Sequence, residues 1–145
     1  MHSFIPINKI ISYLKSKIKY KLKILDLGCG RNLIAKTFEK NNNFNIIGYD
    51  HVSYNGSIVC DISKLPHDNQ SINMCIFSQS LMGSNWKEYL KEGYRVLTYN
   101  GEMIISESSS RYESIKTYVE ELGLKIIEEE YNETKRWFYL YVIKN

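Results

Sequence analysis

Cysteine and histidine are scarce in this sequence, and neither is arranged to bind a metal. The chain has three cysteines and three histidines among 145 residues. The cysteines form no C-x-x-C pair, the histidines are not clustered, and an odd number of widely spaced cysteines is typical of reduced thiols. We therefore expect no metal site and no disulfide framework. The cysteines are Cys29, Cys60 and Cys75.

Long hydrophobic runs are also absent. No apolar stretch reaches the roughly 20 residues that a membrane-spanning helix needs, and the first residues lack the basic region, apolar core and cleavage site of a secretory signal. We therefore expect an intracellular protein that does not contact a membrane. A chain of 145 residues is long enough for one compact domain but leaves little for a second. We predict a single domain over 1–145, with an N-terminal helical segment over 1–20.

A further absence concerns the glycine turn that follows the first predicted strand. An apolar run over 22–27 predicts a buried strand, which breaks at Gly28-Cys29-Gly30 and passes into a predicted helix. The dinucleotide fingerprint G-x-G-x-x-G requires a third glycine where this chain has Leu33. Residues without a Cβ allow a ligand to approach closely. The missing third glycine favours S-adenosylmethionine over a dinucleotide, because the amino-acid end of S-adenosylmethionine can sit on a turn with only Gly28 and Gly30. A dehydrogenase that binds NAD is the disfavoured alternative.

Acidic residues follow the next two predicted strands. Asp50 ends the second strand and lies 22 positions after Gly28, a separation at which an acidic residue reaches a nucleotide ribose. Asp61 follows the third strand, where its carboxylate can accept a hydrogen bond from the adenine amino group. The neighbouring Ile62 can offer its backbone N–H and an apolar contact to the adenine ring. Because the carboxyl ends of parallel strands meet at one edge of a sheet, we expect these residues to bind one adenosine group. The alternative for Asp50 is an aspartate that closes a turn.

The remaining pattern predicts an α/β fold. Apolar residues three and four apart indicate helices, and short apolar or β-rich runs indicate strands. Their order is typical of a three-layer, Rossmann-like class I methyltransferase fold, with a mostly parallel sheet and a C-terminal antiparallel hairpin. The first crossover helix is expected to bury Leu33, Ile34 and Phe38. The predicted helices cover 7–18, 31–39, 86–97 and a stretch that ends at Leu122, and the predicted strands cover 22–27, 44–47, 57–60, 72–77, 102–106, 124–131 and 137–143.

Positive charge is concentrated near the start of the chain. The net charge is +3, and a run of lysines precedes the first acidic residue, Asp26. Such a run can meet the phosphates of a nucleic acid. The alternative is that these lysines only solvate the outer face of a helix. They are Lys9, Lys15, Lys17, Lys19, Lys21 and Lys23.

Several segments resemble the methyltransferase domain of the ribosomal RNA-processing protein 8 (nucleomethylin) family. They are D-L-G-C-G, G-Y-D, C-D-I, F-S-Q-S-L-M-G-S-N-W, E-G-Y-R-V-L, S-E-S-S-S-R-Y and L-G-L-K-I, all within about the last 120 residues. The resemblance implies a methyltransferase that modifies N1 of an adenine in large-subunit ribosomal RNA. It also implies that S-adenosylmethionine is held by Gly28, Asp50, Asp61, Ile62 and Ser78.

The resemblance fails before the first strand. Family members carry a longer front section there, with a histidine-bearing stretch that closes over the cofactor and a basic extension. We therefore expect a protein partner that supplies the missing elements, and the family implies a nuclear or nucleolar location. The alternative function is a catalytically silent domain that retains the cofactor and serves as a scaffold or subunit of an RNA-modifying complex.

In methyl transfer from a sulfonium, the main tasks of the protein are to orient the nucleophile and to exclude water from the reacting groups. No catalytic triad is needed, and none is visible in the sequence. Methylation at N1 leaves a positive charge on the adenine, which must be unpaired or flipped out before it reacts. We expect Glu107, at the end of the fifth predicted strand, to stabilise that charge. The alternative is that Glu107 only caps the following helix.

Overall fold

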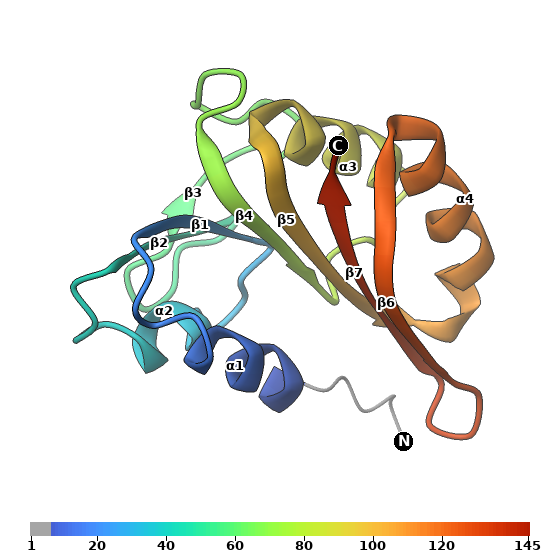
Figure 1. Ribbon diagram of the computed structural model, residues 1–145, viewed down its shortest axis with the longest axis horizontal. Helices are drawn as coiled ribbons and strands as arrows, with labels where there is room; N and C mark the ends of the chain where they lie inside the picture. Colours follow the sequence, from blue (N-terminus) through green and yellow to red (C-terminus); the bar gives the residue numbers. More distant parts are fainter. Residues whose placement is uncertain (1–6) are drawn as a thin grey trace.

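The computed structural model describes residues 7–145, which form one sheet with helices on both faces (Figure 1). Residues 1–6 of the predicted segment 1–20 lie outside the described residues. The sheet has seven strands in the order β3-β2-β1-β4-β5-β7-β6. The strands are β1 (Leu22–Leu27), β2 (Phe44–Asp50), β3 (Ile58–Val59), β4 (Ile72–Ser78), β5 (Leu97–Ser108), β6 (Leu124–Asn132) and β7 (Trp137–Lys144).

The strand directions confirm the α/β class and the C-terminal antiparallel pair. Neighbouring strands from β3 to β5 are parallel, whereas β7 lies antiparallel between β5 and β6. The connection over 51–57 contains no helix, as predicted for the link between the second and third strands. The helices are α1 (Ile7–Lys15), α2 (Leu33–Thr37), α3 (Trp86–Val96), α4 (Tyr112–Leu122) and the short 3-10 helix η1 (Ser109–Arg111).

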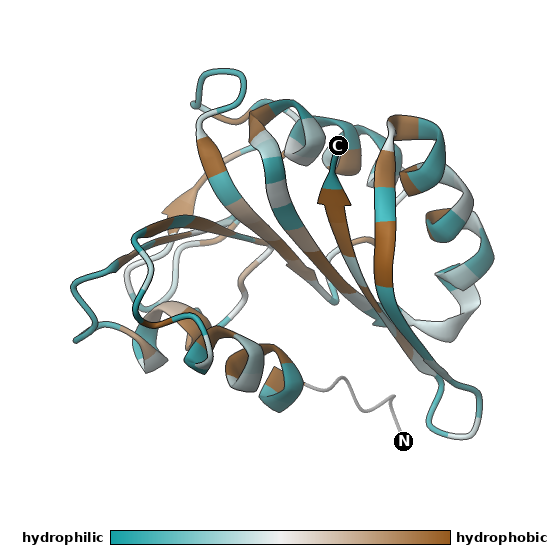
Figure 2. Ribbon diagram, viewed as in Figure 1, coloured by the Kyte–Doolittle hydropathy of each residue, from teal (hydrophilic) through white to brown (hydrophobic). Residues whose placement is uncertain are grey.

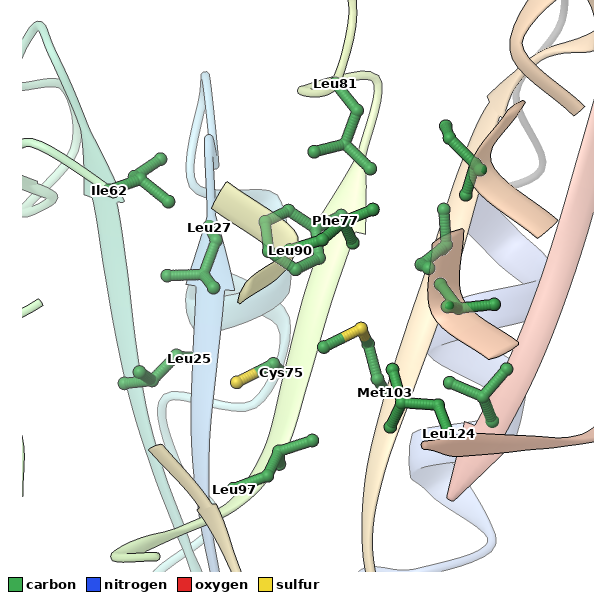
Figure 3. Close-up of a cluster of buried hydrophobic side chains, with 14 of the residues drawn as sticks. Leu25, Leu27, Ile62, Cys75, Phe77, Leu81, Leu90, Leu97, Met103 and Leu124 are labelled. Atoms are coloured by element: carbon green, nitrogen blue, oxygen red, sulfur yellow. The ribbon is translucent and has the colours of Figure 1, made fainter. Parts of the chain in front are cut away.

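Two hydrophobic clusters fix the layers. The larger cluster packs α3 and α4 against one face of the sheet, and Figure 3 shows part of it around Leu27, Phe77 and Leu90. The smaller cluster packs α1, through Ile10 and Leu14, together with α2 against the opposite face. Figure 2 shows apolar residues on the strands and on the helix sides that meet them. Among residues 7–145, none of the helices combines the length and apolar character that crossing a membrane requires.

Both helices of the α1 and α2 layer are shorter than predicted. The main-chain oxygen of Tyr13 accepts hydrogen bonds from the N–H and from the hydroxyl of Ser16, and this local competition ends α1 before Ile18, which is 45% exposed. In α2, the left-handed backbone of Asn32 (φ 59°) delays the first helical residue to Leu33. The predicted burial of Leu33 is wrong, because this side chain is 50% exposed.

The two strands next to the site also differ in length from the prediction. β5 begins at Leu97 rather than at residue 102, because Asn100 adopts a positive φ of 66° and lets the chain continue as a strand through the predicted turn. β3 is reduced to Ile58 and Val59, both exposed at the edge of the sheet. The C-terminal end of α4 at Leu122 is as predicted, with Gly123 in a left-handed conformation (φ 100°).

Candidate cofactor site

The residues predicted to bind a nucleoside gather where the parallel strands end. We call the turn at 28–30, with Asp50, Asp61 and Ser78, the strand-end site. β1, β2 and β3 are parallel neighbours, and β4 lies on the other side of β1. Their carboxyl ends therefore share one edge of the sheet, which is where open α/β sheets bind ligands. The N–H groups of Gly28 and Cys29 both donate to the main-chain oxygen of Tyr49, at 2.8 and 3.1 Å.

The two glycines of the turn have different surroundings. Both have positive φ angles, 83° at Gly28 and 53° at Gly30, which favour glycine. A Cβ at Gly28 would lie 2.3 Å from the Cβ of Ser80, so the loop after β4 packs directly on this residue. A Cβ at Gly30 would meet nothing within 4 Å. The space above Gly30 is therefore open to a ligand.

Asp50 is bonded directly to the glycine turn. Its Oδ2 accepts a hydrogen bond of 2.8 Å from the N–H of Gly30, and its Oδ1 accepts one of 2.8 Å from the N–H of His51. The Asp50 side chain is only 15% exposed. The same Oδ1 also lies 2.8 Å from Nδ1 of His51, whereas Oδ2 retains a second lone pair and so has the capacity to accept a hydrogen bond from a ribose hydroxyl. The structure thus brings together the turn and the acid that the sequence spacing paired.

Asp61 and Ile62 follow at the end of β3. The N–H of Cys60 donates to the main-chain oxygen of Asp50 at 2.9 Å, which joins this segment to β2. Asp61 is exposed, and hydrogen bonds from the hydroxyl and N–H of Ser63 lower the pKa of its carboxyl group. The side chain of Ile62 is 4% exposed and belongs to the same core cluster as Leu27 (Figure 3). Only the backbone of Ile62 is therefore placed to contact a ligand.

Ser78 and Glu107 stand at the ends of β4 and β5. Ser78 pairs with Ser106 across the two strands. Glu107 is fully buried, and its Oε2 accepts hydrogen bonds from the N–H groups of Ser80, at 2.5 Å, and Leu81, at 2.9 Å. These bonds go to the loop after β4 and not to the following helix. The Oε1 of Glu107 is buried without a partner among the described residues.

Burial raises the pKa of Glu107 to about 7, although the two loop N–H groups act to lower it. A buried carboxyl that is easily protonated near neutral pH is costly to keep ionised. The structure thus shows Glu107 holding the loop beside the strand-end site. Its role in stabilising a methylated base stays a prediction.

Asp26 belongs to the site but was not among the predicted residues. It lies in β1, two positions before Gly28, and is 3% exposed. Burial, together with the negative charge of Asp50, raises the pKa of Asp26 to about 7. A signal was present in the sequence, since an aspartate between Leu25 and Leu27 interrupts an apolar strand. Carboxylates are rarely buried without a partner or a function.

Gly48 and Asn32 also shape the site and were not predicted. A Cβ at Gly48 would lie 2.1 Å from Oδ1 of Asn32, so only glycine permits this approach. The side-chain amide of Asn32 donates to the main-chain oxygen of Asn55 at 3.0 Å. Asn32 therefore ties the glycine turn to the loop after β2. No local pattern distinguishes Asn32 from other asparagines, because its partners are distant in sequence.

The charges of the strand-end site suit an organic cation. Asp26 and Asp50 raise each other's energy when both are ionised, and a bound positive charge relieves that repulsion. Among the described residues, no group of three or more His, Cys, Asp or Glu side chains could hold a metal ion. S-adenosylmethionine carries a sulfonium and an ammonium group, so the buried acids and the open space above Gly30 fit this cofactor.

Comparisons with known proteins show the family to which the chain belongs. Residues 3–145 match the model of a family described as a hypothetical methyltransferase. The 25S rRNA (adenine(645)-N(1))-methyltransferase of Schizosaccharomyces pombe is 36% identical over 115 residues, which are 74% of this chain and 36% of that protein. Ribosomal RNA-processing protein 8 of Dictyostelium discoideum is 36% identical over 140 residues, 94% of this chain and 35% of the relative. The chain thus spans about a third of these relatives.

Solved structures of low sequence identity share the fold. The crystal structure of the cyclase SpnF has a TM-score of 0.80 at 14% identity and covers 94% of this chain and 80% of its own. The 1,6-didemethyltoxoflavin-N1-methyltransferase of Burkholderia thailandensis, solved with S-adenosylhomocysteine, has a TM-score of 0.78 at 12% identity, covering 94% and 77%. With the family match over residues 3–145 and the relatives above, the chain belongs to the ribosomal RNA-processing protein 8 family and has the class I methyltransferase fold.

Proposed function

We propose that this domain binds S-adenosylmethionine at the strand-end site and transfers its methyl group to N1 of an adenine in ribosomal RNA. The observation that carries the proposal is the hydrogen bond between the N–H of Gly30 and Asp50, which fixes the glycine turn and the ribose-binding acid together beneath open space. The names of the relatives, an rRNA adenine-N1-methyltransferase and ribosomal RNA-processing proteins, support the choice of substrate.

Different residues of the strand-end site would bind different parts of the cofactor. Asp50 would bind the ribose hydroxyls, Asp61 would accept a hydrogen bond from the adenine amino group, and the backbone N–H of Ile62 would contact the ring. Gly28 and Gly30 would leave room for the amino-acid end, and the carboxylate of Asp26 would attract its ammonium group. The bound cofactor supplies a methyl group that is already activated by its sulfonium. The protein therefore has to hold and align the nucleophile rather than activate it.

The acceptor base belongs beside the loop over 78–85. This loop follows β4 and is held against the glycine turn by the contact between Ser80 and Gly28. Its fixed position orients the acceptor and excludes water from the methyl group. The reacting face of adenine is its Watson–Crick edge, so the base has to leave its pairing partner first. Glu107 remains our candidate for stabilising the methylated base, through the Oε1 atom that has no partner among the described residues.

Transfer of a labelled methyl group tests this function. The domain is incubated with S-adenosylmethionine that carries a tritiated methyl group, and with ribosomal or transfer RNA. The modified nucleotide is then mapped. We expect label in ribosomal RNA and the product N1-methyladenosine. Label at another nucleotide contradicts the proposed target, and cofactor binding without transfer to any RNA favours the silent subunit.

The names of the relatives, which include two rRNA adenine-N1-methyltransferases, do not favour the silent subunit, although the fold alone does not dictate methyl transfer. One protein of the same fold, SpnF, is described as a cyclase. The proposed substrate also implies that the protein acts where ribosomal RNA is processed, in the nucleolus of a eukaryotic cell. A protein partner stays a prediction. Co-purification of the tagged protein tests it.

A further inference from the structure

Five lysines alternate along the chain at the edge of the sheet opposite the strand-end site. We call Lys15, Lys17, Lys19, Lys21 and Lys23 the basic edge. They occupy the end of α1, the turn that follows and the start of β1. Lys17 is half-buried and the other four are exposed. No acidic residue occurs in the chain before Asp26, which is buried.

The basic edge is not neutralised by carboxylates. None of the five lysines of the basic edge forms an ion pair with a described residue, whereas Lys9, Lys36 and Lys116 each do. Lys9, near the other end of α1, pairs with Glu128 and Glu130 at 3.0 and 3.2 Å. α1 is therefore compensated at its start and carries unpaired positive charge at its end. The helix dipole explains the placement of Lys15 but not that of the other four lysines, because its favourable effect on a positive charge is confined to the last turn of the helix.

The neighbouring residues extend the basic edge with groups that suit a nucleic acid. Tyr20 is 59% exposed, and the Nζ of Lys17 lies 5.4 Å from the centre of its ring. The side-chain amide of Asn43 donates to the main-chain oxygen of Ile18 at 2.9 Å, which places the loop before β2, with exposed Lys40, beside this turn (Figure 1). An exposed aromatic ring among cations can stack on an unpaired base while the lysines meet phosphates.

We propose that the basic edge binds backbone phosphates of the substrate RNA at a distance from the modified base. The inference rests on the proposed function in one respect, that RNA is the substrate. Along β1, Lys23 lies five positions before Gly28 and Lys21 lies seven before it, so the two sites are roughly 16 to 23 Å apart at about 3.3 Å per residue. Lysines on phosphates position an RNA without reading its sequence. A long, folded RNA spans both sites, whereas a short oligonucleotide occupies only the strand-end site.

A charge-removal pair tests the basic edge. The double variant Lys19→Gln, Lys21→Gln removes two exposed charges that make no ion pair or hydrogen bond among those described. The matched control, Lys91→Gln with Lys125→Gln, removes two exposed charges from α3 and β6. Affinity is measured by fluorescence anisotropy over a salt series, for a folded ribosomal RNA fragment and for a short single strand that contains adenine. Calorimetry with S-adenosylhomocysteine checks that each variant is folded.

We expect the Lys19, Lys21 variant to bind the folded RNA about tenfold more weakly at low salt and to lower the slope of log K against log salt by about 1.5, because each lost phosphate contact contributes 0.7 to 0.9. The control and the short strand should show no change. An unchanged slope, or an equal loss in the control, overturns the proposal. The proposal is also overturned if the domain binds phosphatidylserine vesicles through these lysines but does not bind RNA.

The two proposals fail in different ways. Binding is read without turnover, so a domain that holds folded RNA through the basic edge but transfers no methyl group contradicts the proposed function alone. Methyl transfer to the short strand, combined with unaltered binding of folded RNA in the Lys19, Lys21 variant, contradicts the basic edge alone.

Discussion

At the scale of single residues, Gly28 and Gly30 offer a matched comparison. Both have a positive φ, but a Cβ meets Ser80 at Gly28 and open space at Gly30. We expect Gly28→Ala to lower the free energy of unfolding by about 3 kcal/mol, from backbone strain plus overpacking. Gly30→Ala should cost about 1 kcal/mol, from backbone strain alone. Urea unfolding of the two variants measures the difference, and equal costs would contradict the packing described for Gly28.

The same pair separates stability from binding. The methyl group of Gly30→Ala projects into the space assigned to the cofactor. We therefore expect Gly30→Ala to bind S-adenosylhomocysteine at least about tenfold more weakly, a loss of about 1.4 kcal/mol, while it stays folded. Full affinity in this variant would show that the cofactor lies elsewhere.

Asp26 links the site to the pH dependence of stability. Its pKa is about 7 in the folded protein against an ordinary value of 3.8. Folding therefore favours the protonated carboxyl, and this stabilisation is present below pH 3.8 and is lost as the pH rises to 7. Asp26→Asn removes the dependence, so its Tm should exceed that of the wild type by several degrees at pH 8 and by less at pH 5. Thermal unfolding at both values measures the effect; a gain that is equal at the two pH values speaks against a buried, titrating Asp26.

Asp26 should have the opposite effect on binding. An ionised Asp26 attracts the ammonium group of the cofactor, and the fraction ionised increases as the pH rises through 7. We expect the affinity of the wild type for S-adenosylhomocysteine to rise between pH 6 and pH 8, and that of Asp26→Asn to be weaker and flat. Calorimetry at three pH values tests this. A parallel rise in the two proteins would assign the titration to another group.

At the scale of elements, the loop after β4 depends on side chains from β5 and η1. Glu107 binds the N–H groups of Ser80 and Leu81, and Nη2 of Arg111 donates to the main-chain oxygen of Met82 at 2.7 Å. Nothing within the loop itself supplies these bonds. Its position beside the glycine turn is therefore set by the ends of its neighbours.

Substitution of Glu107 tests this arrangement. Glu107→Ala leaves two loop N–H groups without their acceptor and is expected to cost about 2 to 4 kcal/mol of unfolding free energy. Glu107→Gln retains an acceptor oxygen and should cost about 1 kcal/mol. Hydrogen exchange at Ser80 and Leu81 should accelerate in the alanine variant only. Equal exchange in both variants would mean that other contacts hold the loop.

The elements were predictable where the signal is local. Apolar runs at strand spacing identified all seven strands, and the patterns of α3 and α4 gave their ends to within one residue, because Gly93, Val96 and Gly123 satisfy local rules of packing and capping. The ends of α1, α2 and β5 were not predictable in this way. They depend on single residues, Ser16, Asn32 and Asn100, whose local hydrogen bonds or left-handed backbone conformations do not show in the hydrophobic period.

The candidate site divides along the same line. Gly28, Gly30 and Asp50 could be paired from sequence because their separation follows from the geometry of a β-α-β unit. Gly48, Asn32 and Ser80 could not, since each matters through a contact with a residue remote along the chain. The inward side chain of Ile62 was likewise invisible in the sequence.

At the scale of the whole molecule, the sheet separates two kinds of charge. Parallel strands send Asp26, Asp50 and Asp61 toward one edge and leave the basic edge at the other. The acidic end suits a cationic cofactor, and the basic end suits a polyanion. The net charge of +3 is small because the acidic and basic residues largely cancel, so it does not reveal this separation of charge. The two proposed sites therefore lie at opposite ends of the same strands.

Calorimetric titration of the wild type and of Asp50→Ala with S-adenosylhomocysteine, and in parallel with NAD, tests most directly whether the strand-end site is a cofactor site. We predict one molecule of S-adenosylhomocysteine bound per chain, a loss of about 1 to 3 kcal/mol of binding free energy in Asp50→Ala, and no heat from NAD. Binding of NAD, or undiminished affinity in Asp50→Ala, would contradict the account.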